Sequence, residues 1–408
     1  MGNALESTFG EVTKHISREE IAETTLQLVK VPSPTGQELE ASEFYAEILR
    51  NAGLEVQLQF VQERRPNVIG KLAGTAHHKN LILCGHIDTI PPEHCVAPKI
   101  ENGRVYGRGS CDMKGGLAAI AAAATAIKSS GIRLQGDLLV SAYCGHEAPV
   151  GKGEGPIALA RAISERKIEA NAAVVAEGPL DSIGIAHGGL AIFKVTVESP
   201  AGSVHTATAP LRSNPILWLG KVIEEIENID AELNLRDWNR LIPQRPSIQV
   251  GMVSGGDFFN RLPASCELVG TIRWDAGETV TDVTRRLRER LNRVEHRIWN
   301  KYDSQVRIHL QVDLVREAYG ISEHEDFVQQ AISAASFVTG KPYVVSGWRM
   351  AYDLSIFSRI GGIPTVGFGS ILPSDSTGHS NNESISIENL ETMAKVYAAL
   401  ALRYCEVA

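Results

Sequence analysis

Several apolar stretches of strand length in this chain end in side chains of the types that bind metals. The stretches and the residues that follow them are 81–85 before His86, 137–145 before His146 and Glu147, and 173–176 before Glu177. In an open α/β sheet the carboxyl ends of parallel strands lie at one edge, which is where ligands bind. The sequence therefore predicts an α/β fold in which these polar side chains gather at one edge of the sheet.

Two aspartates accompany these strand ends. Asp88 follows His86 by two residues, so on an extended segment both side chains point to the same face. A carboxylate there can hydrogen-bond one ring nitrogen of His86 and direct the other nitrogen toward a metal. Asp112 stands in a Gly-rich turn before an Ala-rich helical run at 116–126. Taken singly, these residues are equally explained as polar strand ends and a helix cap.

Together with a histidine near the C-terminus they form one candidate ligand set: His86, Asp112, Glu147, Glu177 and His379. Mixed imidazole and carboxylate ligands suit zinc, manganese or cobalt, whereas a closed structural zinc site favours thiolates. Five ligands are too many for one tetrahedral ion with an open position. They suit two ions about 3.5–4 Å apart that share a bridging carboxylate. We therefore expect two divalent ions, with zinc favoured over cobalt and manganese.

Three motifs occur in the order H-x-D at 86–88, G-R-G-x-x-D-M-K-G-G at 107–116 and G-H-x-x-x-E at 378–383. With these motifs the chain resembles the M20 family of metal-dependent amidohydrolases and peptidases, nearly from end to end. The resemblance implies that Asp112 bridges the two ions and that Asp88 supports His86 from behind. The remaining implied ligands are His86 and Glu177 for one ion, and Glu147 and His379 for the other.

One position departs from the family pattern. The family usually has two adjacent acidic residues after the third strand, the first a general base and the second a metal ligand. Counting without a gap from Asp137 places His146 at the base position and Glu147 at the ligand position. A neutral imidazole is a competent base, although two nearby cations would lower its pKa.

A one-residue shift is the alternative: it moves Glu147 to the base position and removes one ligand. We prefer the ungapped alignment. Three hypotheses then remain, namely that His146 is the base, that the metal activates water with little help from a base, or that hydrolysis has been lost.

Two domains are expected for 408 residues. Capping boxes at 17–20 and 35–38 predict the starts of the first helices. The remaining elements are strands near 55–60, 67–72, 80–85 and 137–144 and helices near 18–30, 36–53, 116–129, 155–166 and 387–405. This α/β pattern predicts a phosphorylase/hydrolase-like catalytic domain at 1–189 and 316–408, with helices around a mixed, mostly parallel sheet.

A β-α-β-β-α pattern follows, and it predicts an inserted α+β domain at 190–315. Its elements are strands near 191–198, 247–253 and 265–274 and helices near 214–229 and 279–298. In the M20 family this insert is a lid that also forms the dimer interface. The resemblance thus implies a homodimer with two-fold symmetry.

The insert contains a second candidate set of residues. By resemblance, His205 reaches the active site of the partner protomer and helps to stabilise an oxyanion. Asn260 and Arg273 would contact the substrate, often its carboxylate. The alternative is a surface histidine and a solvated arginine. In the loop at 346–353, Arg349 could bind a substrate group together with Trp348 and Tyr352, or these side chains could simply pack.

Composition narrows the function classes. A net charge of −8 without a basic block argues against nucleic acid binding. No stretch has the length and apolarity of a membrane span, and the N-terminal residues lack the apolar region of a signal peptide. The six cysteines form no C-x-x-C pair, which is typical of reduced thiols in a cytoplasmic protein.

The sequence therefore predicts a dinuclear metal hydrolase that cleaves an amide-type C–N bond. The expected substrate is a small molecule with a carboxylate: an N-acyl amino acid, a short peptide or an aryl amide or amine. The alternative is an M20-like protein that binds metal and ligand without turnover.

Overall fold

A computed structural model describes residues 3–76, 78–147, 149–210, 212–348, 350, 352–370 and 377–408. The chain divides into two compact units: unit 1 contains 1–185, 321–346 and 352–408, and unit 2 contains 186–320 and 347–351. Unit 2 therefore extends a few residues beyond the expected insert at 190–315, and it also contains 347–351, which was expected in the catalytic domain. Within unit 2, β9 (Gly189–Glu198) and β14 (Arg307–Arg316) pair along nearly their whole lengths. Each unit is described by itself.

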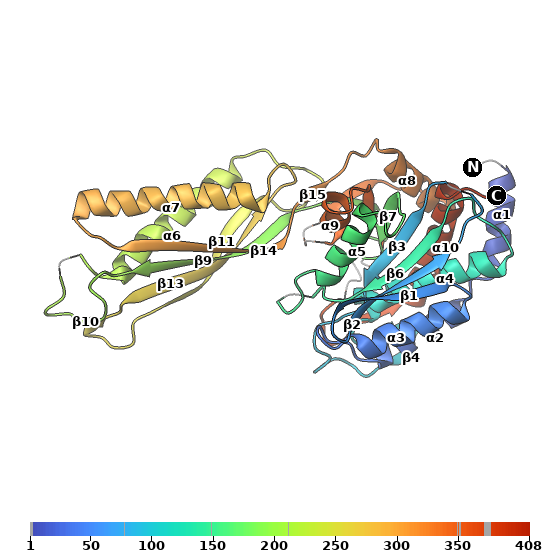
Figure 1. The fold of residues 1–408 in the computed structure, drawn as a ribbon, viewed down its shortest axis with the longest axis horizontal. Helices are drawn as coiled ribbons and strands as arrows, with labels where there is room; N and C mark the ends of the chain where they lie inside the picture. The colour runs from blue at the N-terminus through green and yellow to red at the C-terminus, as the bar shows by residue number, and fades with distance from the viewer. Residues whose placement is uncertain are drawn as a thin grey trace. The chain divides into compact units, whose positions relative to one another are not determined.

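Unit 1 is built on a mixed sheet with the strand order β1-β2-β6-β3-β7-β17-β8. The strands are β1 (Glu55–Gln62), β2 (Arg65–Leu72), β3 (Leu81–His86), β6 (Leu138–Tyr143), β7 (Ala172–Val175), β8 (Ile183–His187) and β17 (Thr365–Gly367). In the middle, β3 runs parallel to both β6 and β7, and β17 runs parallel to β7. The pairing sets His86 opposite Tyr143 and Cys84 opposite Val175. The three strands that precede the candidate ligands therefore end side by side, as the sequence predicts (Figure 1).

The helices of unit 1 form two groups around this sheet. In the first group, α2 (Arg18–Lys30), α3 (Leu39–Asn51), α4 (Gly115–Ser129) and α10 (Ile387–Tyr404) pack on one another and on the sheet, and in the second α5 (Glu154–Ser164) contacts α9 (Leu354–Arg359). The alanines of α4 are buried almost all round, because short side chains allow close contact with α10 and α2. None of the described helices combines the length and apolarity that crossing a membrane requires.

One of the two capping-box predictions was wrong. The Ser17 side chain accepts a hydrogen bond from the Glu20 backbone N–H at the start of α2, as predicted. Glu38, in contrast, is buried and forms two hydrogen bonds to Arg65, so α3 begins one residue after it without a side-chain cap. Thr35 instead donates to Asp88, next to the candidate ligands.

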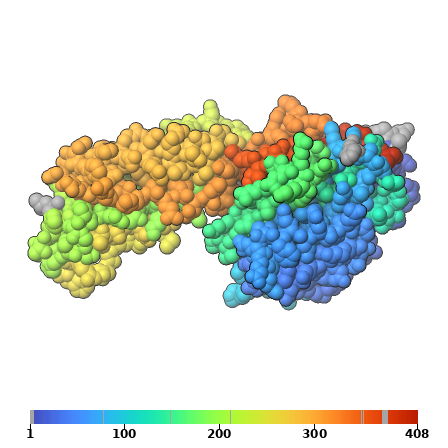
Figure 2. All heavy atoms as spheres, in the orientation of Figure 1, coloured from blue at the N-terminus to red at the C-terminus, as the bar shows by residue number. Residues whose placement is uncertain are grey.

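Unit 2 is a four-stranded antiparallel sheet in the order β11-β13-β9-β14, with two helices packed on it. Its elements are β11 (Ser247–Gly255), β13 (Ser265–Trp274), α6 (Pro215–Asn234), α7 (Val280–Tyr302) and the short pair β10 (Val204–His205) and β12 (Arg261–Leu262), besides β9 and β14. The sequence analysis did not anticipate β14. Apolar side chains of α6, α7 and the sheet form a core of their own, and α7 lies at the surface of this unit (Figure 2).

Smaller elements complete the chain. They are α1 (Asn3–Thr13), β4 (Lys99–Glu101), β5 (Arg104–Tyr106), the π-helical turn at Ser110–Lys114, β15 (Tyr319–Gly320), α8 (Asp326–Thr339), β16 (Val345–Trp348) and β18 (Ser384–Ser386). Among them, β18 pairs with β5 and so ties the segment after His379 to the loop that leads to Asp112.

Candidate metal centre

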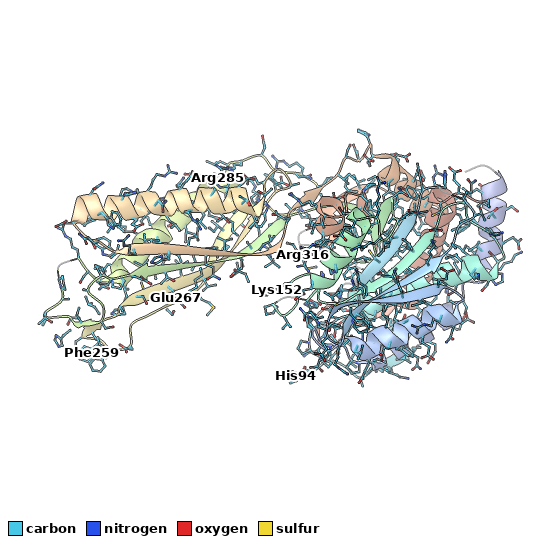
Figure 3. The ribbon with its side chains drawn as sticks, viewed as in Figure 1. His94, Lys152, Phe259, Glu267, Arg285 and Arg316 are labelled. Carbon is cyan, nitrogen blue, oxygen red and sulfur yellow. The ribbon has the colours of Figure 1, made fainter. Side chains whose placement is uncertain are left out.

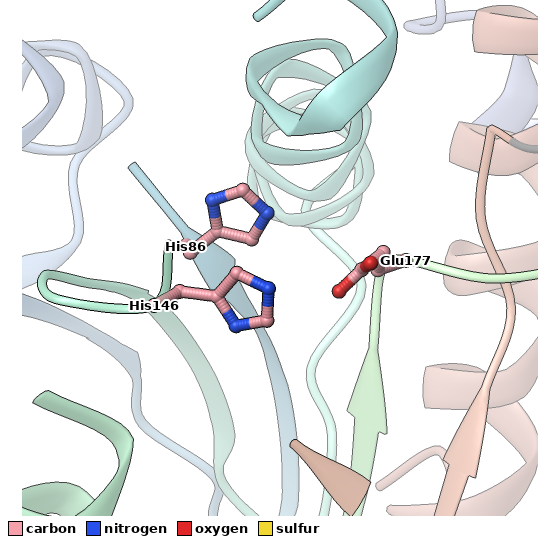
Figure 4. Close-up of side chains that lie close together, drawn as sticks. All are labelled: His86, His146 and Glu177. Atoms are coloured by element: carbon pink, nitrogen blue, oxygen red, sulfur yellow. The ribbon is translucent and has the colours of Figure 1, made fainter. Parts of the chain in front are cut away.

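The centre lies where β3, β6 and β7 end. His86 is the last residue of β3, Glu147 follows β6 and Glu177 follows β7. Potential ligand atoms of His86, Asp112 and Glu147 all lie within 4.8 Å of one another. His86, His146 and Glu177 form a second such group (Figure 4). Among the five residues of these two groups, all but Asp112 lie at or just after strand ends.

Asp112 lies between two histidines. Its Oδ1 is 3.1 Å from His86 Nε2, and its Oδ2 is 3.3 Å from His379 Nε2. His379 Nε2 also lies 2.9 Å from Glu147 Oε1. Each oxygen of one carboxylate thus faces a different imidazole, which is the arrangement needed to bridge two ions. The structure therefore brings together the five residues of the predicted ligand set.

Glu383 fixes the loop that carries Asp112. Its buried Oε1 accepts hydrogen bonds from the backbone N–H groups of Gly109, Cys111 and Asp112, at 3.0–3.1 Å. Its Oε2 pairs with Arg108. The sequence analysis used Glu383 only as the end of the G-H-x-x-x-E motif and missed this role, because the partners are about 270 residues away along the chain.

Two glycines allow the close packing behind the centre. A Cβ on Gly116 would lie 2.6 Å from the backbone oxygen of Ala176, the residue before Glu177. A Cβ on Gly85 would lie 1.9 Å from the Met113 side chain, next to Asp112. Any larger residue at Gly116 would push its segment away from the backbone that leads to Glu177, whereas at Gly85 the Met113 side chain would have to move.

Asp88 contacts His86 as predicted, but through its backbone oxygen and not through its carboxylate. The backbone oxygen of Asp88, 2.7 Å away, accepts the hydrogen bond from His86 Nδ1, while the nearest carboxylate oxygen is 4.0 Å away. The buried carboxylate instead accepts hydrogen bonds from the backbone N–H groups of His146 (3.0 Å) and Glu147 (2.9 Å) and from Thr35 Oγ1 (2.8 Å). These three donors occupy the Asp88 carboxylate, which therefore does not bond to His86. Asp88 thereby orients the loop after β6 as well as His86.

His146 lies against His86 rather than against His379. The two rings are stacked, with centroids 4.2 Å apart and planes 13° apart. Its Nδ1 is 2.7 Å from Oδ2 of the buried Asp353. Glu147 is the residue next to His379, an arrangement that favours the ungapped alignment over the one-residue shift.

Charge in this cluster is balanced by protonated histidine. Hydrogen bonds to Asp112 and Glu147 raise the pKa of His379 to about 10. Burial raises the pKa of Glu177 to about 7. Although burial opposes it, hydrogen bonding to His379 and His86 lowers the pKa of Asp112. Positive charge, from a proton or a bound cation, therefore stabilises this group of carboxylates.

The residues present fit divalent metal ions. Glu177 Oε2 is buried and accepts no hydrogen bond from any residue that the structure describes. An unpartnered carboxylate oxygen is costly unless a cation or a donor meets it. The donor set of two imidazoles and three carboxylates suits zinc, cobalt or manganese. The hydrogen bond from Nδ1 to the Asp88 backbone oxygen holds His86 in the tautomer that leaves Nε2 free to bind a metal.

The remaining candidate residues lie outside this cluster. His205, Asn260 and Arg273 belong to unit 2. There the Asn260 amide is 3.2 Å from His205 Nε2, so the structure brings these two together. Arg273 lies near the other end of β13, which begins five residues after Asn260; eight residues of strand span roughly 26 Å. Arg349 lies outside the described residues.

Known proteins match this chain over most of its length. A family model described as peptidase family M20/M25/M40 matches residues 82–403. The chain is 26% identical to the N-formyl-4-amino-5-aminomethyl-2-methylpyrimidine deformylase of Halalkalibacterium halodurans, with 98% of each chain covered. It is 24% identical to the succinyl-diaminopimelate desuccinylase of Wolbachia pipientis subsp. Culex pipiens, with 94% of this chain and 92% of that chain covered.

Solved structures share the fold. Aminopeptidase PepT from Bacillus cereus superposes with a TM-score of 0.75 at 19% identity, covering 95% of this chain and 98% of its own. A Bacillus subtilis protein described as a dinuclear metal binding peptidase from the M20 family gives 0.70 at 16% identity, covering 96% and 99%. These matches confirm the predicted family resemblance and fold class.

The protonation of the metal-free cluster predicts how metal binding depends on pH. At neutral pH His379 carries a proton, and Glu177 carries a proton in part of the molecules. Because a ligand must lose its proton to bind metal, zinc binding should release protons, and the affinity should rise as the pH rises from about 6 to 8. Calorimetry in buffers of different ionisation enthalpy measures both quantities.

A pair of variants provides the control. His379→Ala should weaken zinc binding and reduce the proton release, whereas His324→Ala, which removes an exposed histidine, should behave like the wild type. Affinity that does not change with pH, with no protons released, would contradict this picture of the cluster.

Proposed function

We propose that this chain, which belongs to peptidase family M20/M25/M40, hydrolyses an amide-type C–N bond in a small substrate that bears a carboxylate. The observation that carries the proposal is the position of Asp112, with one carboxylate oxygen toward His86 and the other toward His379. Such a shared carboxylate suits two divalent ions, of which zinc is favoured by the mixed imidazole and carboxylate ligands. When bound, the ions would polarise the scissile carbonyl and lower the pKa of a water molecule.

The residues of this chain would supply proton transfer. His146 would accept a proton from the attacking water at Nε2 as the water oxygen bonds to the amide carbon. It would then give this proton to the leaving nitrogen when the C–N bond breaks. The direction of its ring supports this role, since Figure 4 shows the Nε2 side of His146 turned toward Glu177. Positioned bases of this kind contribute about 10²–10⁴-fold in rate.

His205 would stabilise the oxyanion. Its Nδ1 accepts a hydrogen bond from the Ala207 backbone N–H at 3.1 Å, and its Nε2 lies beside the Asn260 amide. An imidazole N–H and an amide N–H are the kinds of donor that a developing oxyanion requires. Arg273 would bind a substrate carboxylate through its planar guanidinium.

We further propose a homodimer formed through unit 2. His205 and Asn260 are separated from Arg273 by most of the length of β13, so one copy of unit 2 does not present all three to one small substrate. A partner protomer that contributes His205 would resolve this. Two observations support such an interface: β11 is an edge strand of its sheet, and Met252 and Val253 on it are 68% and 58% exposed.

Other exposed apolar side chains of unit 2 lie at the end of β11 and on α6: Ile216, Leu217, Phe258 and Phe259. Phe259 is 88% exposed and points outward near β10 (Figure 3). Contiguous exposed apolar surface can mark an interaction site, and an edge strand is a ready site for pairing with another chain.

The substrate class is suggested by the relatives. The two curated relatives remove a formyl group and a succinyl group, as their names say, so N-formyl and N-succinyl compounds join N-acetyl amino acids and short peptides as candidates. We also infer a cytoplasmic location, because all six cysteines are free thiols and oxidising compartments favour disulfides.

The function is tested by turnover of zinc-loaded protein on a panel of N-formyl, N-acetyl and N-succinyl amino acids, dipeptides, tripeptides and aryl amides. We expect hydrolysis of at least one carboxylate-bearing member. His146→Ala should lower kcat by about 10²–10⁴-fold, and Glu147→Gln should lower both zinc content and activity. His324→Ala serves as the matched histidine control.

Two outcomes would decide against parts of this proposal. Undiminished turnover in His146→Ala would remove this residue as the base. No turnover of any panel member, with two zinc ions bound per chain, would favour the alternative function of binding without catalysis.

The dimer is tested by sedimentation equilibrium. The wild-type chain should sediment at twice its chain mass, and Val253→Glu should shift it toward the monomer, because a charge on the exposed edge strand opposes pairing. Val344→Glu places the same charge on an exposed valine of unit 1 and should leave the mass unchanged. A monomeric wild type at micromolar concentration would refute this interface.

A further inference from the structure

Asp353 occupies a position where an aspartate usually caps a helix. It directly precedes α9, and the N-cap preference of aspartate comes from hydrogen bonds to the first free N–H groups of the helix. Here its side chain makes no such bond. The carboxylate is fully buried and its Oδ2 lies 2.7 Å from Nδ1 of His146. The side chain is therefore directed to the imidazole at the expense of the helix cap.

The two stacked histidines cannot bind the same ion. A metal bound by an imidazole lies in the plane of the ring, about 2.0–2.1 Å from the nitrogen. The planes of His86 and His146 are only 13° apart, and the ring centroids are separated by 4.2 Å. An ion bound in the plane of His86 would therefore lie well outside the plane of His146. Since His86 is the ring that faces Asp112, His146 would not share an ion bound there.

A hydrogen bond from Nδ1 to a carboxylate sets the tautomer of a histidine. When Nδ1 carries the proton that Asp353 accepts, Nε2 of the neutral ring has the lone pair. Figure 4 shows this Nε2 side turned toward Glu177, parallel to the Nε2 side of His86. A ring nitrogen of His146 lies within 4.8 Å of ligand atoms of His86 and Glu177. The lone pair thus faces the metal centre.

We infer that Asp353 is a positioning residue: it holds His146 in the Nδ1–H tautomer with Nε2 facing the metal centre, where the ring accepts a proton and binds no ion. The inference rests on the proposed function for the identity of that proton, but the tautomer and the metal content do not depend on it. Asp353 and His146 together replace the single carboxylate that usually serves as the base in this family. The distance of 2.7 Å is that of a charge-assisted hydrogen bond.

Asp353→Asn is the most direct test. An asparagine keeps the shape but can present an N–H₂ donor to Nδ1, which favours the opposite tautomer; the same exchange in an Asp–His pair of a serine protease lowers kcat by about 10⁴. Three quantities are measured: zinc per chain, the histidine tautomer by NMR of protein labelled with ¹⁵N-histidine, and kcat and KM separately. His146→Ala identifies the signals of His146, and Asp237→Asn, at a fully exposed aspartate, is the matched control.

We expect Asp353→Asn and His146→Ala to hold as much zinc as the wild type. The wild-type His146 signals should be those of the Nδ1–H tautomer and should move to the other tautomer in Asp353→Asn. On the substrate found with the panel, kcat should fall at least 100-fold with KM changed little. Asp353→Ala should lose activity likewise, and Asp237→Asn should match the wild type.

Two results would overturn the inference. Loss of an ion in His146→Ala would make His146 a ligand. An unchanged His146 tautomer in Asp353→Asn would show that the carboxylate does not set the ring. Both measurements stand even if no panel member is hydrolysed, so failure of the proposed function and failure of this inference are distinguishable.

Discussion

The position of the Asp112 carboxylate between two imidazoles determines how the candidate metal centre is arranged. Asp112 directs one oxygen to His86 and the other to His379, and the other ligands matter only if that placement is kept. Backbone hydrogen bonds to Glu383 hold the loop, and Gly116 lets the start of α4 approach the strand that leads to Glu177. An acidic cluster of this kind is unfavourable without counter-charge. The protein meets this with protonated His379 when no ion is bound and, on our account, with two cations when ions are bound.

The parallel strands position the other candidate ligands. Because β3 pairs with β6 on one side and β7 on the other, a histidine and two glutamates arrive at one edge of the sheet with no long loops between strand and ligand. Asp88 then links two of these segments, since its backbone oxygen holds the His86 ring while its carboxylate holds the N–H groups of His146 and Glu147. The same short loop after β6 therefore carries Glu147, a candidate ligand, and His146, whose ring stacks on another candidate ligand, His86.

How much of this could be predicted from the sequence depended on the range of the interaction. Three candidate ligands, His86, Glu147 and Glu177, could be predicted because each follows a recognisable apolar strand and the ends of parallel strands share one edge of the sheet. The role of Asp88 was predicted with the wrong atoms, because the i, i+2 rule places a side chain on a face but does not say which acceptor meets the ring. Thr35 was expected in a capping box and instead donates to Asp88. The contact of Asp353 with His146 was not predicted, because no local pattern reveals a partner 207 positions away.

The central claim is that two ions lie on either side of Asp112. Anomalous diffraction from crystals of the zinc-loaded protein, recorded at the zinc edge, tests it most directly. Our account predicts two peaks about 3.5–4 Å apart, each within bonding distance of a different Asp112 oxygen, one beside His86 and Glu177 and the other beside His379 and Glu147. A single peak, or two peaks of which one makes no contact with Asp112, would contradict it.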